Sequence, residues 1–264
     1  MKVFLISSNV ASTPYSVYPL GLSMIAASLK NNGHCIEQFD FLASGRSPEA
    51  LTEAIKTFQP ELIGISIRNI DNVNLLNEQR YIDTVKNIID QIRQITQVKI
   101  ILGGSGFSIM PEAILEKVGA DFGIMGEGEA LIADFVKQAG RGVYPKEKII
   151  RSNLKLADRQ IPSACYDSKI MQFYLQSGNV ASVQTKRGCE HKCVYCSYPI
   201  LEGAVIRTRD VKSVVDDIQN LVENFGAKYL FFTDSVFNDE AGNYLKLLEE
   251  IKRRKLVIPW SAFF

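Results

Sequence analysis

Short apolar runs alternate with longer segments of helical periodicity in the first half of the chain, from Lys2 to about Gln138. This alternation is typical of strand–helix units around a parallel sheet. The apolar runs predict strands at Val3–Ser7, Cys35–Phe39, Leu62–Ile67, Lys99–Leu102 and Phe122–Ile124. The periodic segments predict helices at Leu20–Asn31, Pro48–Thr57, Glu78–Gln94, Pro111–Lys117 and Glu129–Lys137. The pattern therefore predicts a doubly wound α/β domain over residues 1–140, with its ligand beyond the carboxyl ends of the strands.

A less regular stretch separates this domain from a second α/β pattern. Residues 141–178 contain charges, Pro145 and Pro162 without a sustained period, so we expect a linker there. Residues 179–264 predict strands at Ala181–Gln184 and Tyr229–Phe232, helices at Val211–Asn224 and Tyr244–Lys252, and a third strand starting at Leu256–Ile258. We interpret this part as the start of an incomplete β/α barrel.

The composition is that of an ordinary globular protein. Of 264 residues, 46% are hydrophobic and 22% are charged, with a formal net charge of +1. This balance does not favour nucleic-acid binding or attraction to an anionic membrane. No apolar stretch approaches the roughly 20 residues of a membrane span, and Met1–Ser8 has no cleavage-site pattern, so we expect a cytoplasmic protein.

Five cysteines are an odd number, and three of them, Cys189, Cys193 and Cys196, stand within eight residues. This arrangement does not resemble the disulfide framework of a small secreted domain. Clustered thiols in a reducing compartment usually hold a metal. The separate Cys35 and Cys165 are expected to be buried structural thiols.

The clustered thiols have the spacing C-x3-C-x2-C, and thiolates are the ligands that iron–sulfur clusters take. Three thiolates on a [4Fe-4S] cluster leave one iron open to the amino and carboxylate groups of a small molecule. Gly188 allows the backbone to turn close to the cluster. Two alternatives remain open: burial of the three cysteines on one helix face, and a zinc site with His191 as the fourth ligand, although zinc usually takes two separated ligand pairs.

The strand, the Arg187-Gly188-Cys189 turn and the cysteine loop resemble the radical S-adenosylmethionine (radical SAM) superfamily. The resemblance implies a partial (β/α) barrel in which the cluster reduces bound S-adenosylmethionine (SAM) and releases a 5′-deoxyadenosyl radical. It also implies an external electron donor of the flavodoxin or ferredoxin type. The implied SAM contacts are Tyr195, Thr233, Asp234 and Ser235. Glu190 stands where many relatives have proline, and Arg207 and Arg209 are expected to be solvated or to lie near the pocket rim.

Glycines and serines recur at the ends of the strands predicted for the first domain. They follow the first strand at Pro19-Leu20-Gly21, the fourth at Gly103–Ser108 and the fifth at Gly126–Glu129. Upstream of the cysteine loop, these features resemble the cobalamin-binding domain of cobalamin-dependent radical enzymes. The resemblance implies a corrinoid between the sheet edge and the barrel mouth. The implied cobalamin contacts are Pro19, Gly21, Ser66, Arg68, Gly104, Ser105, Gly106, Gly126, Glu127, Gly128 and Glu129.

The first domain departs from other cobalamin proteins because it lacks the Asp-x-His-x-x-Gly sequence, and His34 is expected to be a surface residue. The lower cobalt face is then vacant, water-bound or covered by another side chain. Arg68 is a candidate for that role, and the alternative is a salt bridge between Arg68 and Asp71. A classical dinucleotide site is excluded because the first strand leads to Ser7-Ser8-Asn9 without glycine.

The family resemblance implies a cobalamin-dependent radical SAM methyltransferase that acts on an unactivated carbon of a small molecule. One SAM would methylate cob(I)alamin and another would yield the radical that activates the substrate. Cyclisation, rearrangement or non-radical methyl transfer with the same cofactors is the second hypothesis. A truncated, non-catalytic cofactor-binding fragment is the third, because only two strands are predicted after Cys196. A partner or a further C-terminal segment would then complete the barrel and cover its edge. The tail Ile258–Phe264 is expected to pack in the core, with a substrate cavity as the alternative.

Overall fold

The computed structural model describes residues 1–13, 15–151 and 155–264 and divides the chain into two compact units. The first unit comprises Met1–Ser12 and Gly21–Asn153, and the second comprises Thr13–Leu20 and Leu154–Phe264. A short piece of the amino-terminal loop therefore belongs to the same unit as the carboxyl-terminal part of the chain. Among the described residues, no helix has both the length and the apolar character needed to cross a membrane.

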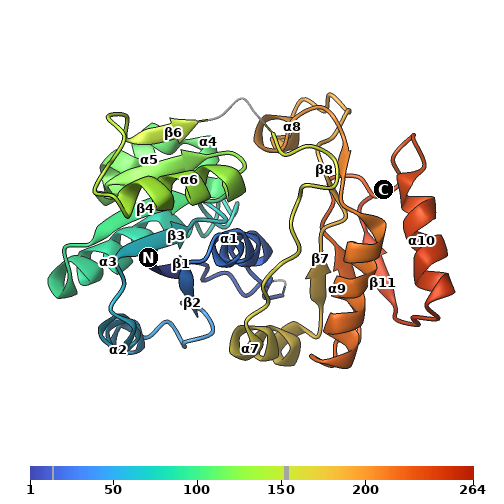
Figure 1. Ribbon diagram of the computed structural model, residues 1–264, viewed down its shortest axis with the longest axis horizontal. Helices are drawn as coiled ribbons and strands as arrows, with labels where there is room; N and C mark the ends of the chain where they lie inside the picture. The colour runs from blue at the N-terminus through green and yellow to red at the C-terminus, as the bar shows by residue number, and fades with distance from the viewer. Residues whose placement is uncertain (14, 152–154) are drawn as a thin grey trace. The chain divides into compact units, whose positions relative to one another are not determined.

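A parallel sheet forms the centre of the first unit, in the order β2-β1-β3-β4-β5-β6 (Figure 1). Its strands are β1 (Lys2–Ser7), β2 (Cys35–Asp40), β3 (Leu62–Ser66), β4 (Lys99–Gly103), β5 (Phe122–Met125) and β6 (Ile149–Arg151). The strand order changes sides between β1 and β3: β2 lies on one side of β1, and β3 to β6 follow on the other side. The last residues of β1 and β3, Ser7 and Ser66, are register partners. In open parallel sheets, such a switch point marks the usual ligand position at the carboxyl edge.

Helices cover both faces of this sheet. They are α1 (Leu20–Asn31), α2 (Pro48–Phe58), α3 (Tyr81–Ile95), α4 (Ser105–Ile109), α5 (Pro111–Val118) and α6 (Glu129–Ala139). Successive side chains of β1 point to opposite faces, and Val3, Phe4, Leu5 and Ile6 are all buried. Phe4 and Ile6 belong to a hydrophobic cluster that includes residues of α2, α3 and α5.

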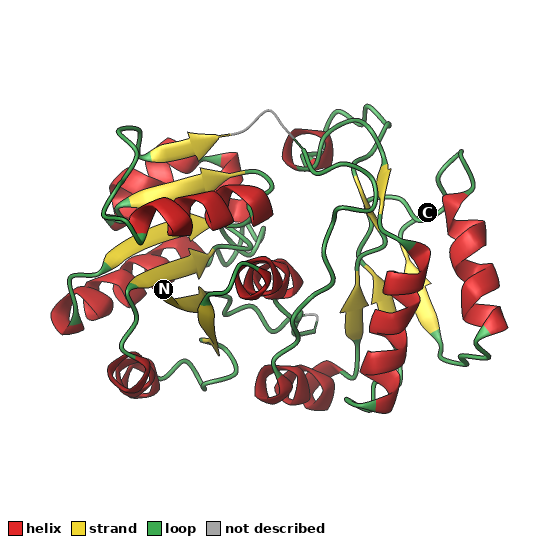
Figure 2. Cartoon of the chain, in the orientation of Figure 1, coloured by secondary structure: helices red, strands yellow, loops and turns green. Residues whose placement is uncertain are grey.

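The second unit contains a three-stranded parallel sheet in the order β11-β10-β7 and a separate antiparallel pair, β8 with β9 (Figure 2). The strands are β7 (Ala181–Val183), β8 (Lys186–Arg187), β9 (Arg207–Thr208), β10 (Leu230–Phe232) and β11 (Trp260–Ala262). The helices are α7 (Ser168–Gly178), α8 (Tyr198–Leu201), α9 (Val211–Glu223) and α10 (Asn243–Arg253). The order β7-α9-β10-α10-β11 gives two successive β/α steps of a barrel.

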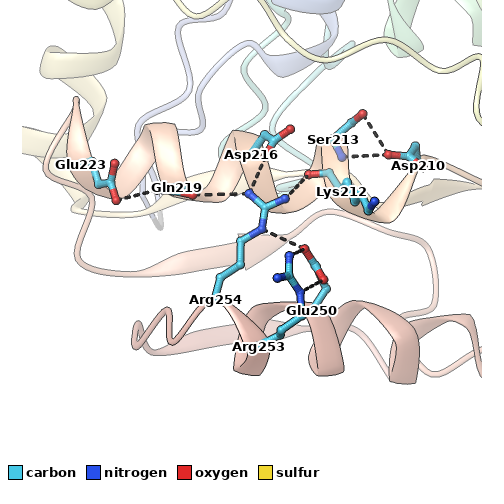
Figure 3. A network of polar contacts seen from close by, with 9 residues as sticks. All are labelled: Asp210, Lys212, Ser213, Asp216, Gln219, Glu223, Glu250, Arg253 and Arg254. Atoms are coloured by element: carbon cyan, nitrogen blue, oxygen red, sulfur yellow. Dashed lines mark hydrogen bonds and ion pairs between the residues drawn. The ribbon is translucent and has the colours of Figure 1, made fainter.

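Polar side chains join α9 to the end of α10 (Figure 3). Arg254 forms an ion pair with Asp216 on α9, and its Nε lies 2.9 Å from Glu250 Oε1. Hydrogen bonds from Arg253 and then Arg254 lower the pKa of Glu250 to about 2. Partly exposed pairs of this kind contribute little stability singly, but here they hold the carboxyl end of α10 against the neighbouring helix.

Tyr18, from the amino-terminal loop, is fully buried within the second unit. Its ring centroid lies 5.6 Å from that of Tyr166 and 5.8 Å from that of Tyr174, and its hydroxyl accepts a 3.2 Å hydrogen bond from the Asp167 N–H. The Asp167 side chain in turn caps α7 by accepting from the Ile170 N–H at 3.0 Å. This cluster anchors Tyr18 in the second unit.

Two sequence predictions of secondary structure were wrong. The segment expected to be an irregular linker, residues 141–178, contains β6 and α7, which are too short or too weakly patterned to stand out. The third strand of the second unit begins at Trp260 and not at Leu256. The cause is the end of α10, where Lys255 takes a φ of 58° and the Leu256 N–H bonds to the Ile251 carbonyl at 3.2 Å.

Candidate functional site

The cysteine loop follows β8 and leads into α8 (Figure 1). All three of its cysteines are free thiols: Cys189 is buried, Cys196 is half-buried and Cys193 is exposed. The Cys196 N–H donates to the Cys193 carbonyl at 3.1 Å, which forms a turn between the last two cysteines. The first thiol is thus fixed inside the unit, and the other two lie on a turn at its surface.

The first turn of the loop requires glycine. Gly188 has a φ of 92°, and a Cβ atom at this position would lie 2.1 Å from the Val205 carbonyl oxygen. Any other residue would therefore be strained and would also collide with backbone. The next residue, Cys189, donates its N–H to the Gly203 carbonyl at 3.1 Å. The predicted close turn exists, but the backbone after α8, and not a ligand, occupies the space beside the glycine.

Two carboxylates after β10 hold the chain just before the cysteine loop. Asp234 is fully buried and accepts from the N–H groups of Thr185 (2.7 Å) and Lys186 (3.2 Å) and from the Thr185 hydroxyl. Burial raises the pKa of Asp234 to about 6, against the opposing effects of Thr185 and Lys186. Asp239 forms a buried ion pair with the Lys186 ammonium group, which also donates to the Phe237 carbonyl. The entry to the loop is therefore tied to the carboxyl end of β10.

The predicted SAM contacts occupy different environments. Tyr195 is 88% exposed, and its electrostatic interaction and hydrogen bond with the neighbouring Cys193 raise the pKa of the phenol. Thr233 is half-buried and donates its N–H to the Val183 carbonyl at 2.9 Å. Ser235 donates its hydroxyl to Glu202 at 3.3 Å, next to the turn before Cys189. Asp234 is buried and its carboxylate accepts from Thr185 and Lys186, so it positions the chain that enters the loop, while its contact with SAM stays a prediction.

The donor chemistry of the loop fits a [4Fe-4S] cluster, because three free thiols on one short loop supply three thiolates and leave one iron open. Within residues 1–13, 15–151 and 155–264, no three His, Cys, Asp or Glu side chains surround a common metal position. Cys193 and Cys196 lie on the exposed turn, where their thiols remain accessible to an incoming cluster. Cys189, Cys193 and Cys196 are the residues that would hold it.

In the first unit, the predicted cobalamin contacts gather at the carboxyl edge of the sheet. Gly104 has a φ of 97°, and a Cβ there would lie 2.4 Å from the Ile67 carbonyl oxygen. Ser105 donates its hydroxyl to the Arg68 carbonyl at 2.8 Å, and the Gly106 N–H donates to the Ile67 carbonyl at 2.9 Å. The turn after β4 therefore packs on the backbone after β3, which accounts for its glycines through protein packing.

Ser108 connects this turn to the next one; it ends the predicted Gly103–Ser108 stretch but is not among the predicted cobalamin contacts. Its hydroxyl donates to the Gly104 carbonyl and accepts from the Gly126 N–H, both at 2.9 Å. The other predicted positions after β5 are half-buried Glu127 and Gly128 and buried Glu129, whose carbonyl accepts from Ser28 at 2.7 Å. The structure thus brings together the contacts predicted after β3, β4 and β5.

The remaining predicted cobalamin contacts lie at the carboxyl end of β3 and around the start of α1. Ser66 is the last residue of β3, and its carbonyl accepts from the Ser8 N–H at 3.2 Å and the Ser8 hydroxyl at 2.9 Å. Gly21 is exposed, with no atom within 4 Å of the place where a Cβ would lie. Pro19 belongs to the second unit, whereas Gly21 belongs to the first.

Several expectations about single residues need correction. Arg207 and Arg209 are buried and not solvated: Arg207 donates to the Leu156 carbonyl at 2.8 Å, and Arg209 pairs with Asp217 at 2.6 Å. Both arginines follow β8 in the chain, and their charged groups make internal contacts. Cys35 is exposed and not a buried thiol, and Cys165 is half-buried. Cys35 starts β2, which is an edge strand of the sheet.

His34, expected at the surface, is half-buried, and its Nδ1 lies 3.4 Å from the amino-terminal nitrogen of Met1. Burial lowers the pKa of His34, and the positive charge of the amino terminus lowers it further. In the expected apolar core segment, Phe263 and Phe264 are largely exposed. Trp260 nonetheless packs in the aromatic cluster, with its ring centroid 5.1 Å from that of Phe237.

The fold and the loop define a class of protein: a doubly wound parallel α/β domain followed by the start of a β/α barrel that carries a three-cysteine loop. Residues 6–136 match the family model of the B12 binding domain. A tryptophan 2-C-methyltransferase of Streptomyces laurentii is 25% identical over 317 aligned positions, which cover 96% of this chain and 52% of that protein.

Solved structures show the same architecture. The radical SAM methyltransferase TsrM from Kitasatospora setae, solved with tryptophan and a SAM analogue, has a TM-score of 0.84 at 25% identity, over 96% of this chain and 51% of that chain. OxsB, a cobalamin-dependent SAM radical enzyme solved with aqua-cobalamin and SAM, has a TM-score of 0.76 at 18% identity, over 98% of this chain and 38% of that chain, and shows the fold alone. The chain spans about half the length of the relatives that it matches.

The resemblance predicted from the sequence, to radical SAM proteins with a cobalamin-binding domain, is confirmed: residues 6–136 match the B12 binding domain, and 96% of the chain is similar to the radical SAM methyltransferase TsrM. The fold predicted from the sequence, a parallel cobalamin-binding domain before a partial radical SAM barrel, is confirmed.

Proposed function

We propose that this chain is the cofactor-binding part of a cobalamin-dependent methyltransferase that uses a [4Fe-4S] cluster and SAM to methylate an unactivated carbon. The observation that carries the proposal is the cysteine loop itself. It stands at the carboxyl end of β/α strands, where barrel enzymes place their chemistry, in the same chain as a B12 binding domain. When bound, the cluster with SAM supplies radical chemistry and cobalamin supplies methyl transfer.

The protein's own residues hold and orient these groups in the proposal. Cys189, Cys193 and Cys196 bind the cluster as thiolates. Tyr195, inside the loop, and Ser235, after β10, are proposed to contact SAM. The turns after β3, β4 and β5, which lie at the carboxyl edge of the sheet, are proposed to contact cobalamin. A small molecule is the proposed substrate, and a flavodoxin or ferredoxin is the proposed electron donor.

The test is anaerobic reconstitution with iron, sulfide and hydroxocobalamin, followed by desalting and analysis of iron, zinc and cobalt. We expect about four irons and one cobalamin per chain. Cys193→Ala should lose most of the iron but keep cobalamin, whereas Cys35→Ala, which removes an exposed thiol of the first unit, should keep both. Zinc in place of iron in the unaltered chain would overturn the proposal.

Methyl transfer is tested separately, with SAM carrying an isotopically labelled methyl group. Label in the product distinguishes methyl transfer from cyclisation or rearrangement. Binding of both cofactors without formation of 5′-deoxyadenosine or methylated product would instead support a binding role for this chain. That role is the second candidate function, because the chain spans about half the length of its relatives.

A further inference from the structure

Glu202, in the turn after α8, joins three segments of the second unit through one carboxylate. Its Oε2 accepts from the Gly188 N–H at 3.1 Å and from the Ser235 hydroxyl at 3.3 Å. Its Oε1 accepts from the Gln184 side-chain amide at 3.3 Å. Gln184 follows β7, Ser235 follows β10 and Gly188 begins the cysteine loop, so the carboxylate meets each segment where it leaves its strand.

The backbone around Glu202 is held as firmly as its side chain. Arg207 donates to the Glu202 carbonyl at 2.5 Å, and Lys155 donates to the Leu201 carbonyl at 2.8 Å. The Gly203 carbonyl accepts from the Cys189 N–H at 3.1 Å. The turn therefore contacts both Gly188 and Cys189, by side chain and by backbone respectively, and few other positions for the first cysteine are compatible with these bonds.

The hydrogen-bond partners of Gln184 also restrict which residue can occupy position 202. The Gln184 amide oxygen accepts from Arg187 Nε at 2.9 Å, which leaves the Gln184 NH₂ group pointing to Glu202. All three groups directed at the Glu202 carboxylate are donors, so only a side chain with two acceptor oxygens satisfies them. A glutamine at position 202 would oppose one NH₂ group to another.

We propose that Glu202 is a positioning residue for the iron–sulfur cluster, because it fixes the Gly188 turn and thereby the Cys189 thiolate. The inference rests on the proposed function, since it presumes that Cys189 ligates a cluster. Groups that orient the ligands of a metal centre are needed for full affinity, and their loss typically costs about 10–100-fold. Glu202 acts on the cluster through the loop and not by touching it.

The experiment measures iron loss to a chelator, at a pH at which every variant is folded, for reconstituted full-length protein and four variants. Glu202→Ala should release iron roughly tenfold faster or more, and Glu202→Gln should be intermediate. The double exchange, Glu202→Gln with Gln184→Glu, keeps the net charge and restores the pairing. In this variant the carboxylate introduced at position 184 accepts both from the amide introduced at position 202 and from Arg187, so most of the unaltered rate should return. Glu190→Gln, which removes an exposed charge next to Cys189, is the control and should change the rate little.

Two further readouts separate positioning from general stability. The EPR spectrum of the reduced cluster should shift in Glu202→Ala and return in the double variant, and Trp260 fluorescence should show that the fold is retained. Unaltered iron release and EPR in Glu202→Ala would overturn the inference. If Glu202→Ala does not fold, the double variant decides: recovery beyond Glu202→Gln supports the inference, and no recovery overturns it. Absence of any cluster in the unaltered chain would refute the proposed function instead.

Discussion

Replacing Asp234 with asparagine should flatten the pH dependence of stability of the second unit. The side chain is fully buried below the cysteine loop and accepts three hydrogen bonds from Thr185 and Lys186. Asparagine has the same shape and keeps a carbonyl oxygen for the two N–H donors, while the Thr185 hydroxyl can rotate to accept from the new amide. The change therefore removes the titrating charge with little loss of packing.

The magnitude follows from the pKa of Asp234, which burial raises from 3.8 to about 6. A difference of about two pKa units corresponds to roughly 3 kcal/mol. Because the pKa in the folded state lies above that in the unfolded state, this contribution to stability is fully present below about pH 4 and is lost as the pH rises through about 6. The unaltered protein should therefore lose roughly 3 kcal/mol more than Asp234→Asn between pH 4 and pH 7.

The assay is urea unfolding at pH 4.5 and pH 7.5, followed by the fluorescence of Trp260. This residue is the single tryptophan of the chain, and its ring centroid lies 5.3 Å from that of Phe232 on β10, just before Asp234. Part of the effect is already lost at pH 4.5, so the expected difference between these two pH values is roughly 2 kcal/mol. With a slope of roughly 2 kcal/mol per molar urea, the shift in midpoint between the two pH values should therefore differ by about 1 M between the two proteins. Equal pH dependence in both proteins would refute the reasoning. Asp234→Ala, which leaves two buried N–H groups unpaired, should lower stability by about 2–5 kcal/mol at either pH.

Two further predictions concern the same region. Gly188→Ala should lower the free energy of unfolding by about 2–4 kcal/mol, because Gly188 has a φ of 92° and a Cβ there would collide with Val205. The control Gly226→Ala, at a φ of 72° with open space around it, should cost only about 1–2 kcal/mol. Similar urea midpoints for the two variants would contradict the clash with Val205. Burial would raise the pKa of Asp239, but the ammonium group of Lys186 outweighs it and holds the pKa low. Lys186→Met should therefore destabilise by about 3–5 kcal/mol, and adding Asp239→Asn should recover part of the loss in the same urea assay; no recovery would show that the buried charge is not the cause.

Local features could be predicted from the sequence because they depend on neighbours in the chain. The apolar runs and periodic segments of the first domain predicted β1 to β5 closely. The C-x3-C-x2-C spacing predicts a metal-binding loop, and the structure places its three cysteines as free thiols between β8 and α8. Prediction failed where the pattern was weak, as for α7 and β6. It also failed at Leu256, which was predicted to start a strand but forms a hydrogen bond that closes the end of α10.

The network beneath the cysteine loop could not be predicted in this way. Glu202 and Gln184 are 18 residues apart, and Asp234 lies 48 residues from Lys186. Nothing in the local sequence distinguishes Glu202 or Gln184 from surface residues, and Asp234 was predicted as a SAM contact and not as a support of the loop. Lys186 is a partial exception, since a lysine beside an apolar strand and before Arg187-Gly188-Cys189 can indicate a buried charge that needs a partner. Its partner Asp239, 53 residues further on, carries no such signal.

The sequence by itself determined the class of fold, the two kinds of unit and the three thiols, because strand and helix periodicity and ligand spacing are properties of contiguous residues. The tertiary structure alone decided what each polar side chain does. It showed that Gly104 and Gly188 make room for backbone, that Asp234 is directed into the protein, and that Glu202 joins three strand ends. These roles arise because parallel strands bring their carboxyl ends to one edge, where residues distant in the chain must satisfy one another's hydrogen bonds once water is excluded.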